Sequence, residues 1–211
     1  MKIKTSWDDA TVQELQVAES LIKYGFEENT VFYFPVMPQV VNEPKGRTSL
    51  TEKQQQGIAE LFEIGGHTIT HPLLTRIPLD SCVPEIVDSR KMLQEKFAQD
   101  INSFAYPRGY ANPEIQMMVK QAGYTNARST LVGYIHESEN NFFEQTTVHV
   151  GCDRKEYGGL NWYEYAIKML DECVKVNGTY HLWGHGFELV SYPNGMKLFN
   201  DLLRKLSEHK R

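Results

Sequence analysis

Two histidines and a pair of aspartates are the residues of this chain best suited to hold a metal ion. His67 and His71 are four positions apart, and Asp8 and Asp9 follow a short stretch at the N-terminus. Two imidazoles and a carboxylate form the ligand set of a hydrolytic metal site with positions left open. A fully extended strand would separate the two imidazoles by about 13 Å, too far to share one ion. We therefore expect a strand that ends near His67 and a tight loop that carries His71.

Each of these pieces also has an ordinary interpretation. A His-x-x-x-His pair is commonly two surface or core histidines, and an Asp-Asp pair after a strand is commonly a helix N-cap. Thr11-Val12-Gln13-Glu14 has the Ser/Thr-x-x-Glu form of a capping box, so the cap has another candidate. Asp8 and Asp9 are then free for chemistry, and their combination with both histidines favours a functional site.

The composition indicates a single catalytic domain over residues 1–211. With 41% hydrophobic residues the chain can bury one sizeable core, and nothing in the sequence divides it. The formal net charge of −5 argues against nucleic acid or an anionic membrane as a partner. No stretch approaches the roughly 18 apolar residues of a membrane span, and we expect no signal peptide, because Met1 leads straight into the acidic motif.

The three cysteines, Cys82, Cys152 and Cys173, are widely spaced and form no Cys-x-x-Cys pair. This pattern predicts reduced thiols rather than a disulfide framework or a thiolate zinc site. We therefore expect a cytoplasmic protein.

Strand and helix patterns alternate along the chain. Strands are expected at residues 1–6, 30–34, 103–106 and 179–184, near 124, and just before the first histidine. Helices are expected where apolar residues recur at three- and four-residue steps, at 12–21, 58–62, 83–97, 115–122, 162–174 and 196–206. Gly65 and Gly66 break the second helix before the histidine strand. Residues 129–161 are the least regular segment and predict a meandering strand with loops.

This alternation predicts an α/β fold in which helical crossovers join parallel strands. Six or seven units in 211 residues suit a small, distorted (β/α) barrel better than a complete eightfold barrel, which takes about 250 residues. The active site of such a barrel lies at the carboxyl ends of its strands. Asp8, Asp9, His67, Pro107-Arg108-Gly109 and His185 all fall at expected strand ends, so we expect them at one mouth.

Four segments carry a further indication. Ser6-Trp7-Asp8-Asp9, His67-Thr68-Ile69-Thr70-His71-Pro72, Phe104-Ala105-Tyr106-Pro107-Arg108-Gly109 and Trp183-Gly184-His185 occur in this order. Together they resemble the motifs of the polysaccharide deacetylases, carbohydrate esterase family 4 or the NodB homology domain, in order and rough spacing from residue 5 to about 189. The resemblance implies a distorted (β/α) barrel with a divalent metal ion, commonly zinc, held by Asp9, His67 and His71.

The resemblance also implies catalytic roles. Asp8 would take a proton from the attacking water as general base, and His185, as imidazolium, would protonate the departing amine. A backbone N–H in the loop Pro107–Tyr110 would help to stabilise the oxyanion. An amine leaves poorly without a proton, so an acid opposite the base is needed.

Two motifs depart from the family pattern. The third motif usually begins with an arginine that orients the base, but Ala105 occupies that position, and Arg108 is either its replacement or an ordinary loop arginine. The fourth motif usually has an aspartate that tunes the histidine acid, and Asp153 or Glu188 could serve instead.

Aromatic and histidine residues near the expected mouth have two interpretations. Tyr106, Tyr110 and Trp162 could stack on a sugar, or they could pack in the core or rim. His181 and His185 share one face of the last strand, but His181 lies roughly 13 Å nearer the amino end. We therefore expect His185 to be the acid and His181 to be a hydrogen-bonded interior residue.

The sequence therefore predicts a metal-dependent hydrolase that removes an N-acetyl group from a sugar. Alternatives are hydrolysis of another C–N bond in a small amide, and an inactive carbohydrate-binding protein. Retention of Asp8 and His185 argues against an inactive binder. The expected cytoplasmic location favours a nucleotide-linked or lipid-linked sugar precursor as the partner.

Overall fold

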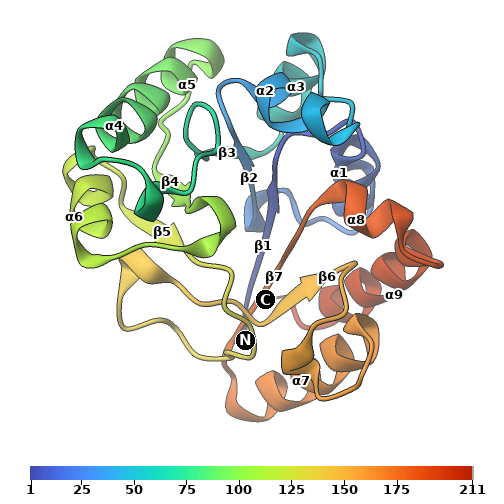
Figure 1. Cartoon of the computed structure of the whole chain (residues 1–211). Coiled ribbons are helices and arrows are strands. Elements are labelled where there is room, and N and C mark those ends of the chain that lie inside the picture. Colours follow the sequence, from blue (N-terminus) through green and yellow to red (C-terminus); the bar gives the residue numbers. More distant parts are fainter. Residues whose placement is uncertain (211) are drawn as a thin grey trace.

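The computed structural model describes residues 1–210, and within them seven parallel strands form one curled sheet (Figure 1). The strand order is β5-β4-β3-β2-β1-β7-β6. The strands are β1 (Lys2–Asp8), β2 (Thr30–Phe34), β3 (Glu63–Gly66), β4 (Ser103–Ala105), β5 (Asn126–Arg128), β6 (Val148–Val150) and β7 (Thr179–Gly184). The predicted α/β barrel with six or seven parallel strands is confirmed.

Strand β1 has seven residues and lies between β2 and β7 in the sheet. It pairs over Lys2–Trp7 with Thr179–Gly184 of β7 and over Thr5–Asp8 with Thr30–Tyr33 of β2. Residues 129–147, the first part of the segment 129–161 that was predicted to be irregular, lead from one end of the strand order, β5, to the other, β6. No ladder joins β5 to β6 in the described part of the chain, so the sheet is a distorted barrel rather than a closed one.

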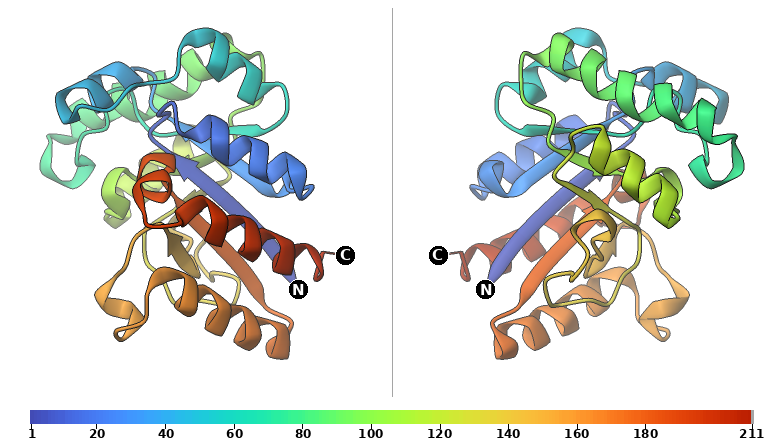
Figure 2. Two further views of the ribbon diagram at one scale, coloured as in Figure 1. Left: turned by 90° about the vertical axis from the view of Figure 1, so that its right-hand side faces the viewer. Right: turned by 90° about the vertical axis from the view of Figure 1, so that its left-hand side faces the viewer.

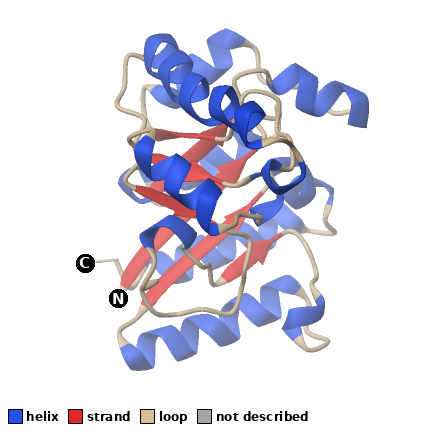
Figure 3. Ribbon diagram, turned by 60° about the vertical axis from the view of Figure 1, so that its left-hand side comes forward, coloured by secondary structure: helices blue, strands red, loops and turns tan. Residues whose placement is uncertain are grey.

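Helices cover the outside of the curled sheet, as parallel connections require (Figures 2 and 3). The α-helices are α1 (Glu14–Lys23), α2 (Pro38–Asn42), α3 (Glu52–Ala59), α4 (Leu79–Val83), α5 (Ser89–Phe97), α6 (Pro113–Gln121), α7 (Trp162–Val176), α8 (Gly186–Ser191) and α9 (Gly195–Ser207). A π-helical turn over Pro84–Asp88 joins α4 to α5, so the pattern at 83–97 corresponds to one nearly continuous helical stretch. The short helix α8 was not predicted. None of the helices described in residues 1–210 is both long and apolar enough to cross a bilayer.

The core is built on aromatic contacts between the sheet and its helices. Trp7 of β1 meets Phe199 of α9 edge-on with ring centroids 5.2 Å apart, and Phe32 of β2 meets Phe62 in the same way at 5.1 Å. Edge-to-face pairs of this kind each contribute about 0.5–1.5 kcal/mol beyond their buried area. The central strands are therefore fixed at the positions from which the functional residues project.

Gly65 and Gly66 lie inside β3 rather than before it, so the predicted break at this point is wrong. A Cβ atom on Gly65 would overlap the ring of Tyr33, and one on Gly66 would overlap the hydroxyl of Tyr124. Glycine is needed here because neighbouring aromatic rings lie directly over the strand. His67 follows Gly66 immediately and therefore leaves the sheet at its carboxyl edge.

The predicted capping box at Thr11–Glu14 is also wrong. Helix α1 begins at Glu14, and its N-cap residue, Gln13, makes no side-chain capping bond. The Thr11 hydroxyl instead donates to the Glu14 carboxylate, which also accepts the Gly186 N–H at 2.9 Å. Glu14 therefore connects the loop after β1 to the start of α8.

Candidate active site

A cavity of about 360 Å³ opens at the carboxyl ends of the strands. Most of the sequence-predicted site residues line it, although they come from four separate segments. These are Asp8, Asp9, His67, His71, Arg108 and His185. The fold therefore brings together residues that are up to 177 positions apart, as the strand-end argument predicted.

Asp9, His67 and His71 converge on one point. The Oδ1 atom of Asp9 lies 3.6 Å from Nε2 of His67 and 3.5 Å from Nε2 of His71. The predicted strand end and tight loop are confirmed: β3 ends at Gly66, and His71 has a φ angle of 59°. Asp9 likewise has a φ angle of 75°. Such strained backbone in residues other than glycine is concentrated at functional sites.

The donor atoms of this group are in the state that a metal ion requires. His67 Nδ1 is 2.7 Å from the Ala105 carbonyl oxygen, so Nδ1 carries the hydrogen and Nε2 keeps its lone pair. Burial, together with the neighbouring His67 ring, lowers the pKa of His71 to about 3, so this ring is neutral. Oδ1 of Asp9 is buried and has no hydrogen-bond partner. A buried carboxylate oxygen without a partner between two imidazole nitrogens fits a divalent cation.

Asp9 is ionised despite its burial. Burial alone would raise the pKa of Asp9, but the positive charge of His185, with the imidazoles of His67 and His71 close by, outweighs it and holds the pKa below its usual value. Arg47 adds a positive charge at 3.5 Å from Oδ2. The carboxylate therefore presents a negative charge to the centre of the cavity.

Asp8 is held by Arg128, a residue that the sequence analysis missed. Nη2 of Arg128 donates to Oδ1 of Asp8, and both side chains are buried. The guanidinium also lies 5.0 Å from the ring centroids of Tyr33 and Trp183. Of the two interpretations of Arg108, the one in which it replaces the missing arginine is not supported, because Arg128, at the end of β5, pairs with Asp8 and Arg108 is exposed. The sequence did hold an indication of this role, because Arg128 lies at the carboxyl end of the strand expected near residue 124, where site residues of a barrel are found.

His185 is oriented by Glu188, which settles the alternative between Asp153 and Glu188. Nδ1 of His185 lies 2.6 Å from Oε2 of Glu188, and Nε2 lies 3.9 Å from Oδ2 of Asp9. Burial would lower the pKa of His185, but the hydrogen bond and charge of Glu188 outweigh it and raise the pKa to about 9. Asp153 instead accepts the Trp162 N–H at the start of α7. His185 is therefore an imidazolium at neutral pH.

Two of the three aromatic candidates are too deeply buried to contact a sugar. Tyr106 is 1% exposed and donates its hydroxyl to the Phe142 carbonyl at 2.8 Å, and Trp162 is fully buried at the start of α7. The stacking role is therefore wrong for both, and the core-packing alternative is confirmed. Tyr110 is 62% exposed but does not line the cavity.

The loop Pro107–Tyr110 offers few backbone donors for an oxyanion. Proline has no N–H, and the Gly109 N–H already donates to the Tyr106 carbonyl at 2.7 Å. The predicted oxyanion donor is thereby narrowed to the N–H of Arg108 or Tyr110.

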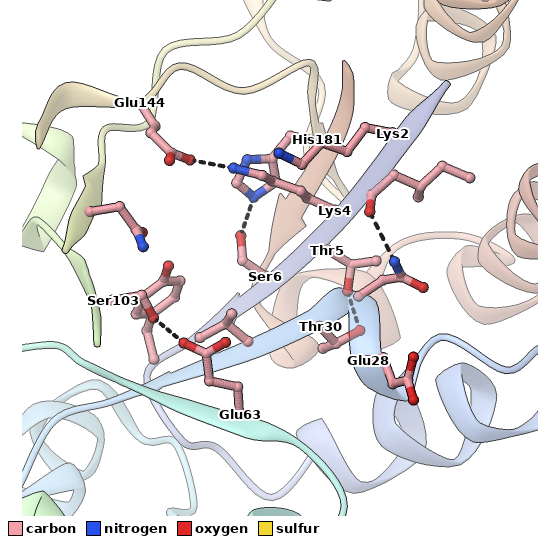
Figure 4. A pocket seen from close by; sticks show the side chains of 15 residues that line it. Lys2, Lys4, Thr5, Ser6, Glu28, Thr30, Glu63, Ser103, Glu144 and His181 are labelled. Atoms are coloured by element: carbon pink, nitrogen blue, oxygen red, sulfur yellow. Dashed lines mark hydrogen bonds and ion pairs between the residues drawn. The ribbon is translucent and has the colours of Figure 1, made fainter. Parts of the chain in front are cut away.

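His181 lies at the opposite, amino end of the barrel, as expected. Its Nε2 is 2.9 Å from the Ser6 hydroxyl, and its ring is 5% exposed beside a second cavity that Lys4 and Glu144 also line (Figure 4). His181 is therefore a hydrogen-bonded interior residue, and of these two histidines it is His185 that lies close to Asp9.

Asp9, His67 and His71, with Asp8 and His185 beside them, lie at the carboxyl edge of a curled parallel sheet, where barrels of this class carry their active sites. A family model described as polysaccharide deacetylase matches residues 8–127. The chain therefore belongs to the polysaccharide deacetylase family. No curated protein matches the sequence.

Solved structures share the fold at low sequence identity. A Streptococcus pyogenes deacetylase in complex with acetate is 19% identical with a TM-score of 0.56, and the match covers 67% of this chain and 62% of that one. A Mycobacterium smegmatis protein of the polysaccharide deacetylase type is 12% identical with a TM-score of 0.72, covering 98% and 83%. A Bacillus anthracis pseudoenzyme of carbohydrate esterase family 4 is 13% identical with a TM-score of 0.63, covering 99% and 61%. The chain thus spans less than two thirds of the streptococcal and anthracis proteins.

Proposed function

We propose that the protein is a metal-dependent hydrolase that removes an N-acetyl group from a sugar. The observation that carries this proposal is the unpartnered, buried Oδ1 of Asp9 between the two Nε2 atoms of His67 and His71. These three residues would hold a divalent ion, and their nitrogen and oxygen donors suit zinc. Such an ion supplies Lewis acidity toward the acyl carbonyl and toward water. Family membership supports the acyl-transfer chemistry.

Asp8 is the residue placed to act as general base. Its Oδ1 is held by Arg128, so the carboxylate keeps a fixed orientation while its second oxygen is left to accept a proton from water. Asp8 lines the cavity directly beside Asp9. Because Arg128 cannot lose its proton, it fixes the carboxylate without competing for the transferred proton.

His185 is the residue placed to act as general acid. Glu188 binds Nδ1, which leaves Nε2–H directed toward the cavity, 3.9 Å from Asp9. The departing amine would take its proton from this nitrogen. Asp8 and His185 thus supply a base and an acid on two sides of the Asp-His-His group.

An inactive carbohydrate-binding protein is the principal alternative, and one of the solved structures with this fold is a pseudoenzyme. The buried Asp8–Arg128 pair and the His185–Glu188 pair argue against it here. A binding protein has no need for two charged pairs that fix a base and an acid. The site geometry is the same for hydrolysis of another C–N bond in a small amide, so that alternative is separated from sugar N-deacetylation by the substrate that is turned over.

The rim of the cavity favours a substrate that carries negative charge. Lys45, Arg47, Arg108 and Arg154 line it, and of these Arg47 also pairs with Asp9 and Arg154 with Glu156. Tyr106 and Trp162 are buried, and the guanidinium of Arg47 lies over the ring of Phe187, the aromatic residue at the rim, at 3.4 Å from its centroid. Arginine side chains recognise phosphate through paired N–H donors. We therefore propose a phosphate-bearing N-acetyl sugar, such as a nucleotide-linked or lipid-linked precursor. The cytoplasmic location stays a prediction.

The direct experiment measures acetate release together with the appearance of a free amine. The substrates are a neutral N-acetylated chito-oligosaccharide and a phosphate-linked N-acetylglucosamine, tested at low and high salt. We expect turnover with the phosphate-linked sugar and a lower rate at high salt. His67→Ala should lose turnover together with one bound equivalent of metal. His136→Ala, an exposed histidine at the opposite end of the barrel, is the matched control. Absence of acetate release from every substrate by zinc-loaded protein would overturn the proposal.

A further inference from the structure

A second group of metal-type donors lies on the far side of His185 from the Asp-His-His group. Nε2 of His149, Sγ of Cys152 and a carboxylate oxygen of Glu188 all lie within 4.8 Å of one another. We propose that these three residues form a second metal site, for zinc or another borderline-soft divalent ion, and that its occupancy interferes with the orientation of His185.

Local packing explains why these residues meet. His149 of β6 pairs in register with Trp183 of β7, and the two rings stack with centroids 3.8 Å apart. The chain then turns at Gly151, which has a φ angle of 78°, and a Cβ atom there would lie 2.6 Å from Cα of Leu189. Only glycine permits this close approach to α8. The turn therefore places Cys152 beside Glu188, the residue that precedes Leu189.

The donor chemistry suits a divalent ion of intermediate softness. One imidazole nitrogen, one thiolate sulfur and one carboxylate oxygen are all ligands that zinc accepts, at about 2.0–2.3 Å each. As the sulfur–metal bond forms, the S–H bond of Cys152 breaks and its proton passes to solvent. One thiolate and one carboxylate then balance the two positive charges of the ion. Water from the adjoining cavity, which Glu188 also lines, can complete the coordination.

Binding requires a small rearrangement that involves the catalytic acid. Nε2 of His149 and Oε2 of Glu188 are 2.7 Å apart, so Nε2 carries the hydrogen of this bond. A metal ion needs the lone pair of Nε2, so this hydrogen passes to solvent while Nδ1 takes one up, which gives the other neutral tautomer. Two ligands of a tetrahedral zinc ion lie about 3.3 Å apart, so this pair must separate. His149 is held by its stack on Trp183 and is 5% exposed, whereas the Glu188 side chain is 26% exposed. Glu188 is therefore the residue that moves.

Movement of Glu188 affects His185 because the same carboxylate oxygen serves both histidines. Oε2 of Glu188 lies 2.6 Å from Nδ1 of His185 as well as 2.7 Å from His149. An ion that draws this oxygen away loosens the hydrogen bond that orients the acid. Excess metal should therefore inhibit turnover. The inhibition rests on the proposed function, whereas the metal binding does not.

Cobalt(II) titration tests the site without reference to activity. A cobalt–thiolate bond gives a charge-transfer absorption in the near ultraviolet, and the Asp9–His67–His71 group contains no sulfur to produce one. We expect this band as a second equivalent of Co²⁺ binds to the parental protein. Cys152→Ser should lose the band and the second equivalent, while Cys82→Ala, which removes a buried cysteine elsewhere, should keep both. A parental protein without the band, or a Cys152→Ser protein that retains it, overturns the site.

Zinc dependence of turnover then tests the link to His185. Acetate release by the parental protein should rise with the first equivalent of zinc and fall several-fold as more is added. Cys152→Ser should keep the basal rate and lose the fall. If the cobalt band appears but excess zinc does not inhibit, the coupling to His185 is overturned. If no protein releases acetate, the cobalt titration still decides the metal site by itself.

Discussion

Replacing Arg128 with methionine tests whether its buried guanidinium serves the carboxylate of Asp8. The two side chains are 1% and 4% exposed, respectively. Arg128→Met leaves a buried carboxylate without its partner, and such a loss costs about 3–5 kcal/mol of unfolding free energy. In a domain of this size each kcal/mol corresponds to about 2–4 °C in Tm. We therefore expect Tm to fall by about 6–20 °C.

The double variant Asp8→Asn/Arg128→Met separates stability from catalysis. It removes both charges, so it should recover most of the Tm that either single variant loses. Its turnover should stay about two to four orders of magnitude below the parental value, because the general base is absent. Melting curves, metal content and acetate release are measured for the parental protein, both single variants and the double variant.

Additive losses of Tm across this cycle would contradict the reasoning, because they would mean that Asp8 and Arg128 stabilise the fold independently. Turnover at the parental rate by metal-loaded Asp8→Asn would exclude Asp8 as the base. Metal content is measured because a variant that has lost its metal would be inactive for that reason alone. Asp9, and not Asp8, is the proposed ligand, so Asp8→Asn should keep its metal.

Three further predictions follow from buried titratable groups. In the parental protein the charge of Glu188 outweighs burial and raises the pKa of His185 to about 9. Glu188→Gln removes this charge, so the alkaline limb of the pH–rate profile should move to lower pH. An unmoved limb would exclude His185 as the acid. Burial raises the pKa of Glu14 from 4.5 to about 8, so Glu14 holds its proton in the folded protein more tightly than in the unfolded chain. Its contribution to stability is complete below about pH 4.5 and is lost as pH rises through about 8; Glu14→Gln should flatten this decline in urea unfolding, and an unchanged slope would contradict the assignment. His181→Gln should lower Tm more than turnover, because the ring is buried against the Ser6 hydroxyl far from the cavity; a greater loss of turnover would mean that the wrong histidine was chosen as the acid.

Asp9, His67 and His71, and the strands that carry them, could be predicted from the sequence because the patterns that indicate them involve residues close together in the chain. The four-residue spacing of His67 and His71 demanded a turn at a strand end, and this is where β3 stops. Strands β2 and β7 match their predicted bounds, because each is a short apolar run bounded by polar or turn residues. The depth argument that separated His181 from His185 depended only on the rise per residue.

The partners of Asp8 and His185, the proposed base and acid, could not be predicted in the same way, because they are fixed by tertiary packing. Arg128 is 120 residues from Asp8 in sequence and meets it only because β5 curls toward the mouth of the sheet. Glu188 stayed one of two candidates because its position depends on α8, a six-residue helix with no clear periodic signal. Tyr106 and Trp162 were not assignable, since an aromatic residue near a strand end or helix start has the same local pattern in the core as at a binding surface.

Metal reconstitution tests the central claim most directly. Protein stripped with a chelator should lose acetate release, and zinc should restore it in proportion to occupancy until the first equivalent is bound. His67→Ala should regain no acetate release at any zinc concentration, while His136→Ala should follow the parental curve. Stripped protein that still releases acetate at the parental rate would contradict the assignment of Asp9, His67 and His71 as a catalytic metal centre.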